Sequence, residues 1–443
     1  MLKDIGFKNI ITFIFVIASV FAFMIFSGTI KVGSDKNQTK GKIVVWGTLP
    51  YNTIQPFIEK SRTKDVEVIY QVKNSDSYER DLVDAFAAGN GPDLFIMNHQ
   101  GILRNADKIF ILPYTSFPKD QYLGNYIRES KIFLTNNGVL AIPFFVDPLV
   151  LYYNKQLISS SFLVGYPKTW EEFSEYAKGI TVSDEYGNIS IAGAAMGTYD
   201  NIPLAKDIVS MLLLQNGNPI VGDDELFGKK KAVLTASPEN TESAKNALTF
   251  YTTFRDRENS MYTWNESKNN AQTEFIAGTL GLYFDRMSQI PRIRKKNPNL
   301  DFGVALVPQI SATSLKKTYG EMYGIAVSKH TKNMQAAILI ASRITGKDVV
   351  EGLTKAMFVA PARNDLLKRK ADDDVVTLSY QSAIIADAWV DPDPKATNIL
   401  MRNLIRSLNA GSLGMYTALR DFDTNLQEIL DRTINKVLKG RLD

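Results

Sequence analysis

The sequence contains no cysteine and only two histidines, His99 and His330, among its 443 residues. Without cysteine the chain can form no disulfide, thiolate nucleophile or zinc–thiolate site, and it offers no cysteine to a lipid anchor. Two histidines so far apart do not make an H-E-x-x-H motif, and the sequence has neither a G-x-S-x-G elbow nor a Walker A loop. We therefore expect no cofactor, no metal site and no enzyme activity.

A surplus of charge of one sign is also missing from most of the chain. The formal net charge is +4, and the first 40 residues hold five Lys and two Asp, so the remainder carries about +1. A nucleic-acid footprint needs a basic stripe, so no nucleic-acid partner is expected. A hydrophobic content of 45% with 22% charged residues is typical of a globular protein, and the length suggests two domains.

One long hydrophobic run is present, close to the N-terminus. Residues 9–30 carry no charge, and residues 10–26 are almost wholly apolar. Such a run can cross a bilayer core of about 30 Å, and it exceeds the roughly 7–15 apolar residues of a signal peptide. We interpret residues 1–40 as an N-terminal transmembrane helix followed by a polar tether, with a cleaved signal as the alternative. Lysines lie on both sides of the run, so its orientation stays open.

Strand-like and helix-like patterns alternate along the rest of the chain. Apolar and β-branched runs predict strands at 42–46, 66–72, 93–97, 139–143, 149–153, 281–284, 302–307 and 323–327. Helical spacing predicts helices at 243–254, 270–276, 334–344 and 418–438. Thr169 followed by Glu172 predicts a capping box, and Ser75 or Asp76 a second helix cap. The alternation predicts an α/β fold with mainly parallel sheets and flanking helices.

Several segments together resemble one known family. In chain order they are AAGNGPDLF (87–95), AIPFFVDPLVLYYNK (141–155), YPKTWEEF (166–173), EFIAGTLGLYF (274–284), FGVALVP (302–308), GEMYGIAVSK (320–329) and VAPAR (359–363). Their order and spacing resemble the extracellular solute-binding proteins of ABC importers, in the cluster that binds maltodextrins. The resemblance implies an importer's permease subunits as partners.

The same resemblance implies a periplasmic-binding-protein-like fold of two lobes that close over a ligand by a hinge motion. It implies crossings between the lobes near 146–149, 301–305 and 344–347. Residues 41–146 plus 302–345 would form lobe 1, and residues 147–301 plus 346–443 would form lobe 2.

Candidate ligand-binding residues lie at strand ends and turns, because open α/β sheets bind ligands beyond the carboxyl ends of their strands. Sugars pack on aromatic rings and pair with carboxylates and amides. These rules select Trp46, Asn98, His99, Asp147, Tyr199, Asp285, Arg286, Glu321, Tyr323, Trp389 and Asp391. Trp389 is the main stacking candidate. Asp147 matches a ligand-contacting glutamate of the maltodextrin-binding cluster, whereas Met97 and Gln100 replace a tryptophan and an aspartate of that cluster.

Each candidate also has a structural interpretation. Trp46 and Trp389 could pack in a core, and His99 could be a hydrogen-bonded loop residue. A carboxylate such as Asp147 could form a salt bridge between the lobes, as could the neighbouring pair Asp285 and Arg286.

The sequence therefore predicts an extracytoplasmic receptor, anchored on the cell membrane, that captures a small solute and passes it to an importer. Carboxylates beside aromatic residues favour a carbohydrate. One alternative is a glycosidase that uses two carboxylates from Asp147, Asp285 and Asp391. The other is a solute-sensing subunit of a signalling complex.

Overall fold

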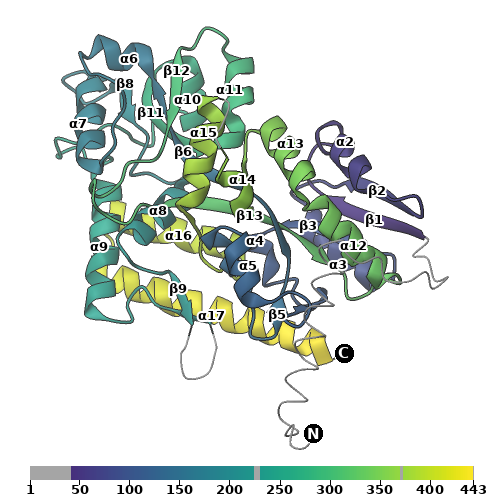
Figure 1. Ribbon diagram of the computed structural model, residues 1–443. Helices are drawn as coiled ribbons and strands as arrows, with labels where there is room; N and C mark the ends of the chain where they lie inside the picture. Colours follow the sequence, from purple (N-terminus) through teal and green to yellow (C-terminus); the bar gives the residue numbers. More distant parts are fainter. Residues whose placement is uncertain (1–40, 224–229, 370–372, 443) are drawn as a thin grey trace, which may run out of the picture.

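A computed structural model describes residues 41–223, 230–369 and 373–442 of the chain (Figure 1). One mixed sheet of eleven strands runs through the molecule, with its main path in the order β2-β1-β3-β13-β6-β11-β8-β7. These strands are β1 Gly41–Gly47, β2 Val66–Val72, β3 Leu94–Asn98, β6 Ile142–Asn154, β7 Val182–Ser183, β8 Ile189–Ala194, β11 Leu280–Arg286 and β13 Thr318–Val327.

Shorter strands complete the sheets. β12 (Phe302–Ala305) and β14 (Ala360–Pro361) pair with β6, and β15 (Ala386–Asp387) pairs with β13. The other short strands are β4 Leu112–Pro113 with β5 Gly138–Val139, and β9 Val221–Asp223 with β10 Lys230–Ala232.

Helices cover both faces of the sheet. Those on the β1–β3 side and around the crossing strands are α2 Tyr51–Ser61, α3 Tyr78–Ala87, α4 His99–Ile102, α5 Lys119–Asn125, α12 Met334–Ile344, α13 Lys347–Met357, α14 Asn364–Leu367 and α15 Asp374–Ile384. Those on the β8–β11 side are α6 Lys155–Ser160, α7 Trp170–Ile180, α8 Ala205–Gln215, α9 Pro238–Thr253, α10 Ala271–Ala277, α11 Ile290–Lys296, α16 Pro394–Asn409 and α17 Met415–Leu442. Two 3₁₀ turns are η1 Arg128–Phe133 and η2 Met287–Gln289.

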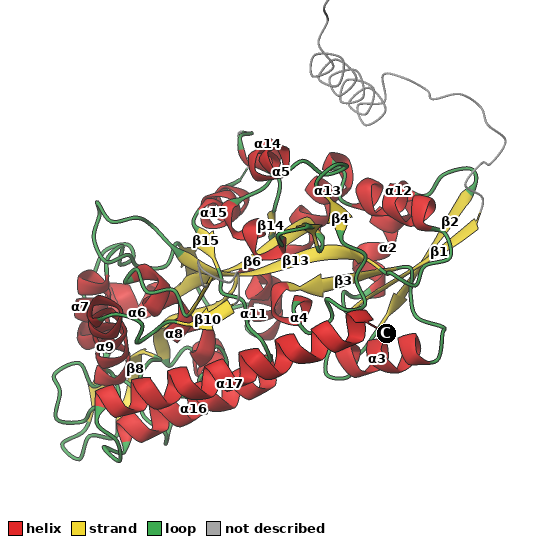
Figure 2. Cartoon of the chain, turned by 90° about the horizontal axis from the view of Figure 1, so that it is seen from below, coloured by secondary structure: helices red, strands yellow, loops and turns green. Residues whose placement is uncertain are grey.

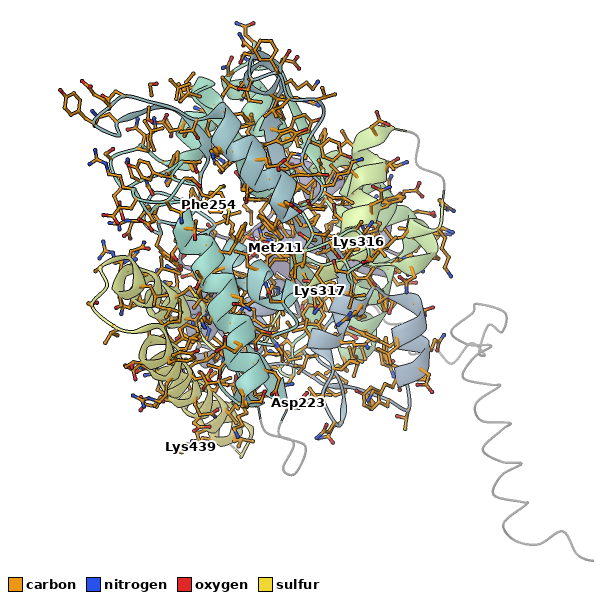
Figure 3. The ribbon with its side chains drawn as sticks, turned by 90° about the vertical axis from the view of Figure 1, so that its left-hand side faces the viewer. Met211, Asp223, Phe254, Lys316, Lys317 and Lys439 are labelled. Carbon is orange, nitrogen blue, oxygen red and sulfur yellow. The ribbon has the colours of Figure 1, made fainter. Side chains whose placement is uncertain are left out.

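The buried hydrophobic side chains form three clusters, two in the first lobe, around β1 and β3, and one in the second lobe, around β8 and β11. In the first lobe, residues such as Ile43, Leu94 and Ile340 pack the sheet against α2 and α12, and α3 and α4 cover the opposite face. In the second lobe, Phe173 and Leu212 belong to one large core between β8, β11 and their helices. Figure 3 shows this lobe in front, with Phe254 at the end of α9 and Met211 on α8.

Several local predictions are confirmed. β1, β2 and α12 form where the sequence predicts them, and Thr169 caps α7 by accepting a hydrogen bond from the Glu172 N–H at 3.2 Å. The Glu172 carboxylate accepts the N–H of Lys168 at 2.6 Å, one residue earlier than a capping box requires. α3 begins after Ser77 instead of Ser75 or Asp76, because the Asn74 side chain accepts the Asp76 N–H and holds those residues in a turn.

Two predictions about the sheet are wrong. The predicted strand 139–143 is divided, with Val139 in β5 and only Ile142 and Pro143 in β6. β6 also contains the predicted strand 149–153, and it runs unbroken through Val146, Asp147 and Pro148 because β13 pairs with it there. The sheets are also not mainly parallel. β1 is parallel to β2 and β3, and β8 to β11, but β6 and β13 run antiparallel to their long neighbours. Both strands extend from one lobe into the other, so antiparallel pairing holds the two halves of the sheet together.

Among the described residues, no helix is both long and apolar enough to cross a membrane. The predicted N-terminal transmembrane helix falls in residues 1–40, which lie outside the described part of the chain.

Candidate functional site

The crossing strands bring three of the predicted site residues together. Glu321 on β13 lies directly opposite Asp147 on β6, and β11 pairs with the other edge of β6 so that Arg286 lies opposite Leu149. The Arg286 guanidinium donates from Nη1 to the Asp147 carbonyl oxygen at 3.2 Å, and its Nε lies 3.9 Å from Glu321 Oε2. The cluster therefore lies where the two lobes join.

Asp207, in the first turn of α8, is the strongest partner of Arg286. The Arg286 Nη2 donates to Asp207 Oδ2 at 2.6 Å, and both side chains are more than 90% buried. Burial opposes the charge on Arg286, but the carboxylates of Asp207, Glu321 and Asp147 outweigh it and raise the pKa of the guanidinium. The cluster holds three carboxyl groups for one guanidinium, so it offers more acceptors than Arg286 can satisfy.

Asp147 is held by a backbone hydrogen bond as well as by its place beside Arg286. Its Oδ1 accepts the backbone N–H of Ser288 at 3.1 Å. Burial raises the pKa of Asp147 to about 7, although Arg286 and Ser288 act in the opposite direction. Near neutral pH this group can therefore act either as a hydrogen-bond donor or as an acceptor.

Asn98 and His99 join the cluster from the end of β3. The Asn98 Nδ2 donates to Glu321 Oε1 at 2.5 Å, while its Oδ1 caps α4 by accepting the Gly101 N–H. His99 is fully buried, and its Nδ1 accepts the Met322 N–H at 3.2 Å, so its Nε2 carries the hydrogen that faces the Tyr319 hydroxyl. Burial, with the charges of Arg286 and Lys206, lowers the pKa of His99 to about 3. This histidine is neutral and fixes the β13 backbone.

Trp389 and Asp391 precede α16 in the chain, and their side chains bind side chains of α8. The Trp389 side chain is 3% exposed, and its Nε1 donates to the Ser210 hydroxyl at 3.1 Å. Asp391 is fully buried, pairs with the Lys206 ammonium and accepts the Thr397 hydroxyl at 2.9 Å. These contacts match the structural interpretation of Trp389, and they occupy the carboxylate of Asp391.

The other four candidates, Trp46, Tyr199, Asp285 and Tyr323, make contacts of their own. The Lys73 ammonium covers the Trp46 ring at 3.5 Å from its centroid, and Tyr323 stacks on Phe145 at 4.6 Å. The Tyr199 hydroxyl donates to Asn398 Oδ1 at 2.7 Å. The carboxylate of Asp285 accepts from the Tyr283 hydroxyl at 2.6 Å and from Gln272 Nε2 at 2.8 Å, which occupies it within the second lobe.

Sequence reasoning missed three charged residues of this region. Lys206 and Asp207 are adjacent charges in the otherwise mostly apolar helix α8, and that contrast is a signal that could have identified them. Glu129 had no such signal. It is 3% exposed and faces Gly320, where a Cβ atom would come within 2.3 Å of Glu129 Oε2. Burial raises the pKa of Glu129 to about 8, and the nearby charge of Asp387 adds to this.

A groove lies apart from the polar cluster. The groove lies between η2, α13 and α15 and is lined by residues that include Met287, Phe358 and Val376, but by no predicted site residue. Within residues 41–223, 230–369 and 373–442, no group of His, Asp and Glu side chains is placed to hold a metal ion.

Comparison with known proteins identifies the family. A sequence model described as "Bacterial extracellular solute-binding protein" matches residues 47–348, which is well over half of the chain. The chain belongs to this family. Its description places the members outside the cytoplasm and gives them a solute-binding role.

Individual relatives are distant. The maltotriose-binding protein of Pyrococcus abyssi is 29% identical over 141 residues, and the match spans only 30% of this chain and 30% of that protein. A putative binding protein of Brucella abortus is 20% identical over 317 residues, which cover 70% of this chain and 72% of the relative.

Solved structures of sugar-binding proteins share the fold. The sugar-binding protein MalE from Xanthomonas citri superposes with a TM-score of 0.72 at 16% identity, over 88% of this chain and 98% of its own. A cyclo/maltodextrin-binding protein complexed with maltotetraose superposes with a TM-score of 0.70 at 16% identity, over 89% and 98%. At this identity the likeness establishes the two-lobed fold.

Proposed function

We propose that this chain is the receptor of an ABC importer and that it captures a small carbohydrate between its two lobes. The observation that carries the proposal is the polar cluster of Asp147, Glu321 and Arg286 at the crossing strands of a solute-binding fold. A group bound there contacts both lobes when they are together, so ligand binding favours the closed arrangement.

The chemistry of the cluster favours a ligand rich in hydroxyl groups. Its surplus carboxylate and amide acceptors suit hydroxyl donors, and charge-assisted hydrogen bonds of this kind are the stronger ones. The two cations placed deepest, Arg286 and Lys206, are already paired with Asp207 and Asp391. An anionic solute such as a sugar phosphate would have to displace one of these pairs, which argues for a neutral sugar.

The glycosidase alternative loses two of its three carboxylates to other contacts. Asp285 is held by Tyr283 and Gln272, and Asp391 by Lys206 and Thr397.

The sensing alternative shares the same closing cleft and differs only in its partner. A stable complex with importer permease subunits supports transport, and a stable complex with a kinase supports sensing.

The assignment of residues to lobes is part of the proposal. We retain 41–146 as lobe 1 and most of 147–301 as lobe 2. Residues 346–369 and 373–386 are better assigned to lobe 1 than to lobe 2. Leu353, Val359 and Leu366 pack in the same core as β1 and β3, and Tyr380 and Ala386 pack in the cluster that contains α3. The chain then crosses between the lobes three times: in β6, in β13 and in the segment between β15 and α16.

The proposed anchor rests on the apolar run at residues 10–26 alone. We propose that it keeps the receptor at the membrane, where it raises the effective concentration near the importer. Membrane fractionation of the full-length chain tests this: a mature N-terminus at Met1 in the membrane fraction supports an anchor, and a shortened soluble form establishes signal cleavage.

A thermal-shift screen of the full-length chain tests the function. The panel holds maltotriose, maltotetraose, mannobiose and tagatose, with a polyamine and an amino acid as other classes. We expect one or more sugars to raise the melting temperature in a saturable way, because a ligand that binds only the native state stabilises it. Stabilisation by the amino acid alone, or by none of the panel, contradicts a sugar receptor.

A further inference from the structure

The long C-terminal helix α17 is attached first to the second lobe. Asp423 accepts the N–H groups of Leu234 and Thr235 at 3.1 and 2.8 Å, and Gln427 Oε1 accepts the Ala232 N–H at 2.9 Å. The apolar residues on this part of the helix, Leu419, Phe422, Leu426 and Leu430, all belong to the second lobe's core.

Beyond Leu430 the same helix reaches the first lobe. Val437 is 7% exposed and belongs to the core cluster that contains Tyr78 and Leu82 of α3 and Ile102 of α4. From Leu430 to Val437 the helix advances about 10 Å, so this single element passes from one core to the other. Figure 2 shows α17 running from the α9 side of the molecule to the neighbourhood of α3, and Figure 1 shows the same course along the lower edge.

The helix crosses on the side of the molecule where α4 meets the loop before α16. Arg104, just after α4, pairs with Glu79 of α3 and lies 3.4 Å from Asp393, the N-cap of α16. α17 packs along α16 and then continues past it. Besides the chain segment between β15 and α16, an ion pair and the end of α17 thus join the lobes at this boundary.

We propose that residues 433–439 form a strap that must leave the first lobe before the two lobes can separate. β6 and β13 run unbroken between the lobes and act as the pivot, while the strap ties the lobes together away from those strands. Val437 is the buried apolar side chain that holds the strap on the first lobe. Burial of one such side chain favours the closed arrangement, yet it still allows the strap to detach often. The strap therefore sets how often the cleft admits a solute. This inference does not depend on which solute binds.

The absence of cysteine makes a direct test possible, since two introduced thiols are the only ones in the chain. Spin labels at Glu67→Cys on β2 and Lys178→Cys on α7, both exposed positions, report the distance between the lobes in the full-length chain without any solute. Val437→Asp removes the anchor, and Leu438→Asp makes the same change at the next residue, whose side chain is 54% exposed.

We expect Val437→Asp to raise the population of long inter-lobe distances about ten-fold, which is the effect of losing one buried Val. Leu438→Asp should match the parent. A thermal melt of each variant checks its folding, and Val437→Ala, with a smaller increase, replaces Val437→Asp if that variant does not fold. Unchanged distances in the Val437 variants, or an equal change in Leu438→Asp, overturn the proposal.

Discussion

Arg286 and Asp207 are joined by a hydrogen bond of 2.6 Å between two side chains that are each more than 90% buried. Removing the guanidinium leaves a buried carboxylate without its cation, which is far more costly than losing an exposed pair. We predict that Arg286→Met lowers the free energy of unfolding by about 3–5 kcal/mol in denaturant titrations. Arg406→Gln, which breaks an exposed pair with Asp200, should cost less than about 1 kcal/mol. Equal losses in the two variants would contradict a buried ion pair at Arg286.

The position of Asp147 opposite Glu321 predicts an effect on binding. Asp147→Asn keeps the size of the side chain and removes the charge-assisted acceptor, so sugar affinity should fall by at least about ten-fold. Asp301→Asn makes the same change in an exposed pair with Lys155 and should leave affinity unchanged. Calorimetric titration with the best sugar of the screen measures both. Full affinity in Asp147→Asn would place the ligand elsewhere.

Substitution of Trp389 tests whether its ring stacks on a bound sugar or packs in the protein core. Because its ring is buried and its Nε1 donates to Ser210, Trp389→Phe should lower the melting temperature through a lost hydrogen bond worth about 1 kcal/mol and a partly filled space. Sugar affinity should stay within about three-fold of the parent. Ser210→Ala added to Trp389→Phe should bring little further loss of stability. A large loss of affinity with unchanged stability would establish Trp389 as a stacking residue.

Glu129 predicts a pH dependence of stability. Its pKa is about 8 in the folded chain, against an ordinary value of 4.5, because burial and Asp387 raise it while Arg286 opposes them. Between these two pH values the folded chain holds a proton that the unfolded chain has lost, so this group's contribution to stability falls as pH rises from about 4.5 to about 8.

Glu129→Gln removes this titration and keeps a neutral side chain of the same size. Between about pH 6 and pH 8.5, the parent should lose on the order of 2 kcal/mol more stability than the variant. Chemical denaturation at the two pH values measures the difference. Parallel losses in the two proteins would mean that Glu129 is ionised throughout this range.

Much of the fold could be predicted from local patterns. β1 and α12 follow from β-branched and amphipathic runs, and α7 from its Thr169 cap. The continuity of β6 could not be predicted, because Asp147 and Pro148 interrupt an apolar run and only pairing with β13 explains why the strand continues. A sequence pattern does not show which strand will supply the missing hydrogen bonds.

The site was predictable in part for a similar reason. Asn98, Asp147, Arg286 and Glu321 lie at strand ends and at an interrupted strand, which is why a sequence pattern selects them as candidates, and the sheet brings them together. The burial of Trp389 depends on how α8 packs against it. Glu129 lies in this region because of a tertiary contact with Gly320. Neither relationship has a local signature in the sequence.

The most direct test of carbohydrate capture by this chain is a calorimetric titration of the full-length protein with maltotriose and maltotetraose, followed by analysis of the recovered sugar. We predict saturable one-site binding of at least one sugar, recovered intact. No heat of binding with either sugar, or release of shorter sugars with new reducing ends, would contradict a receptor that binds carbohydrate without altering it.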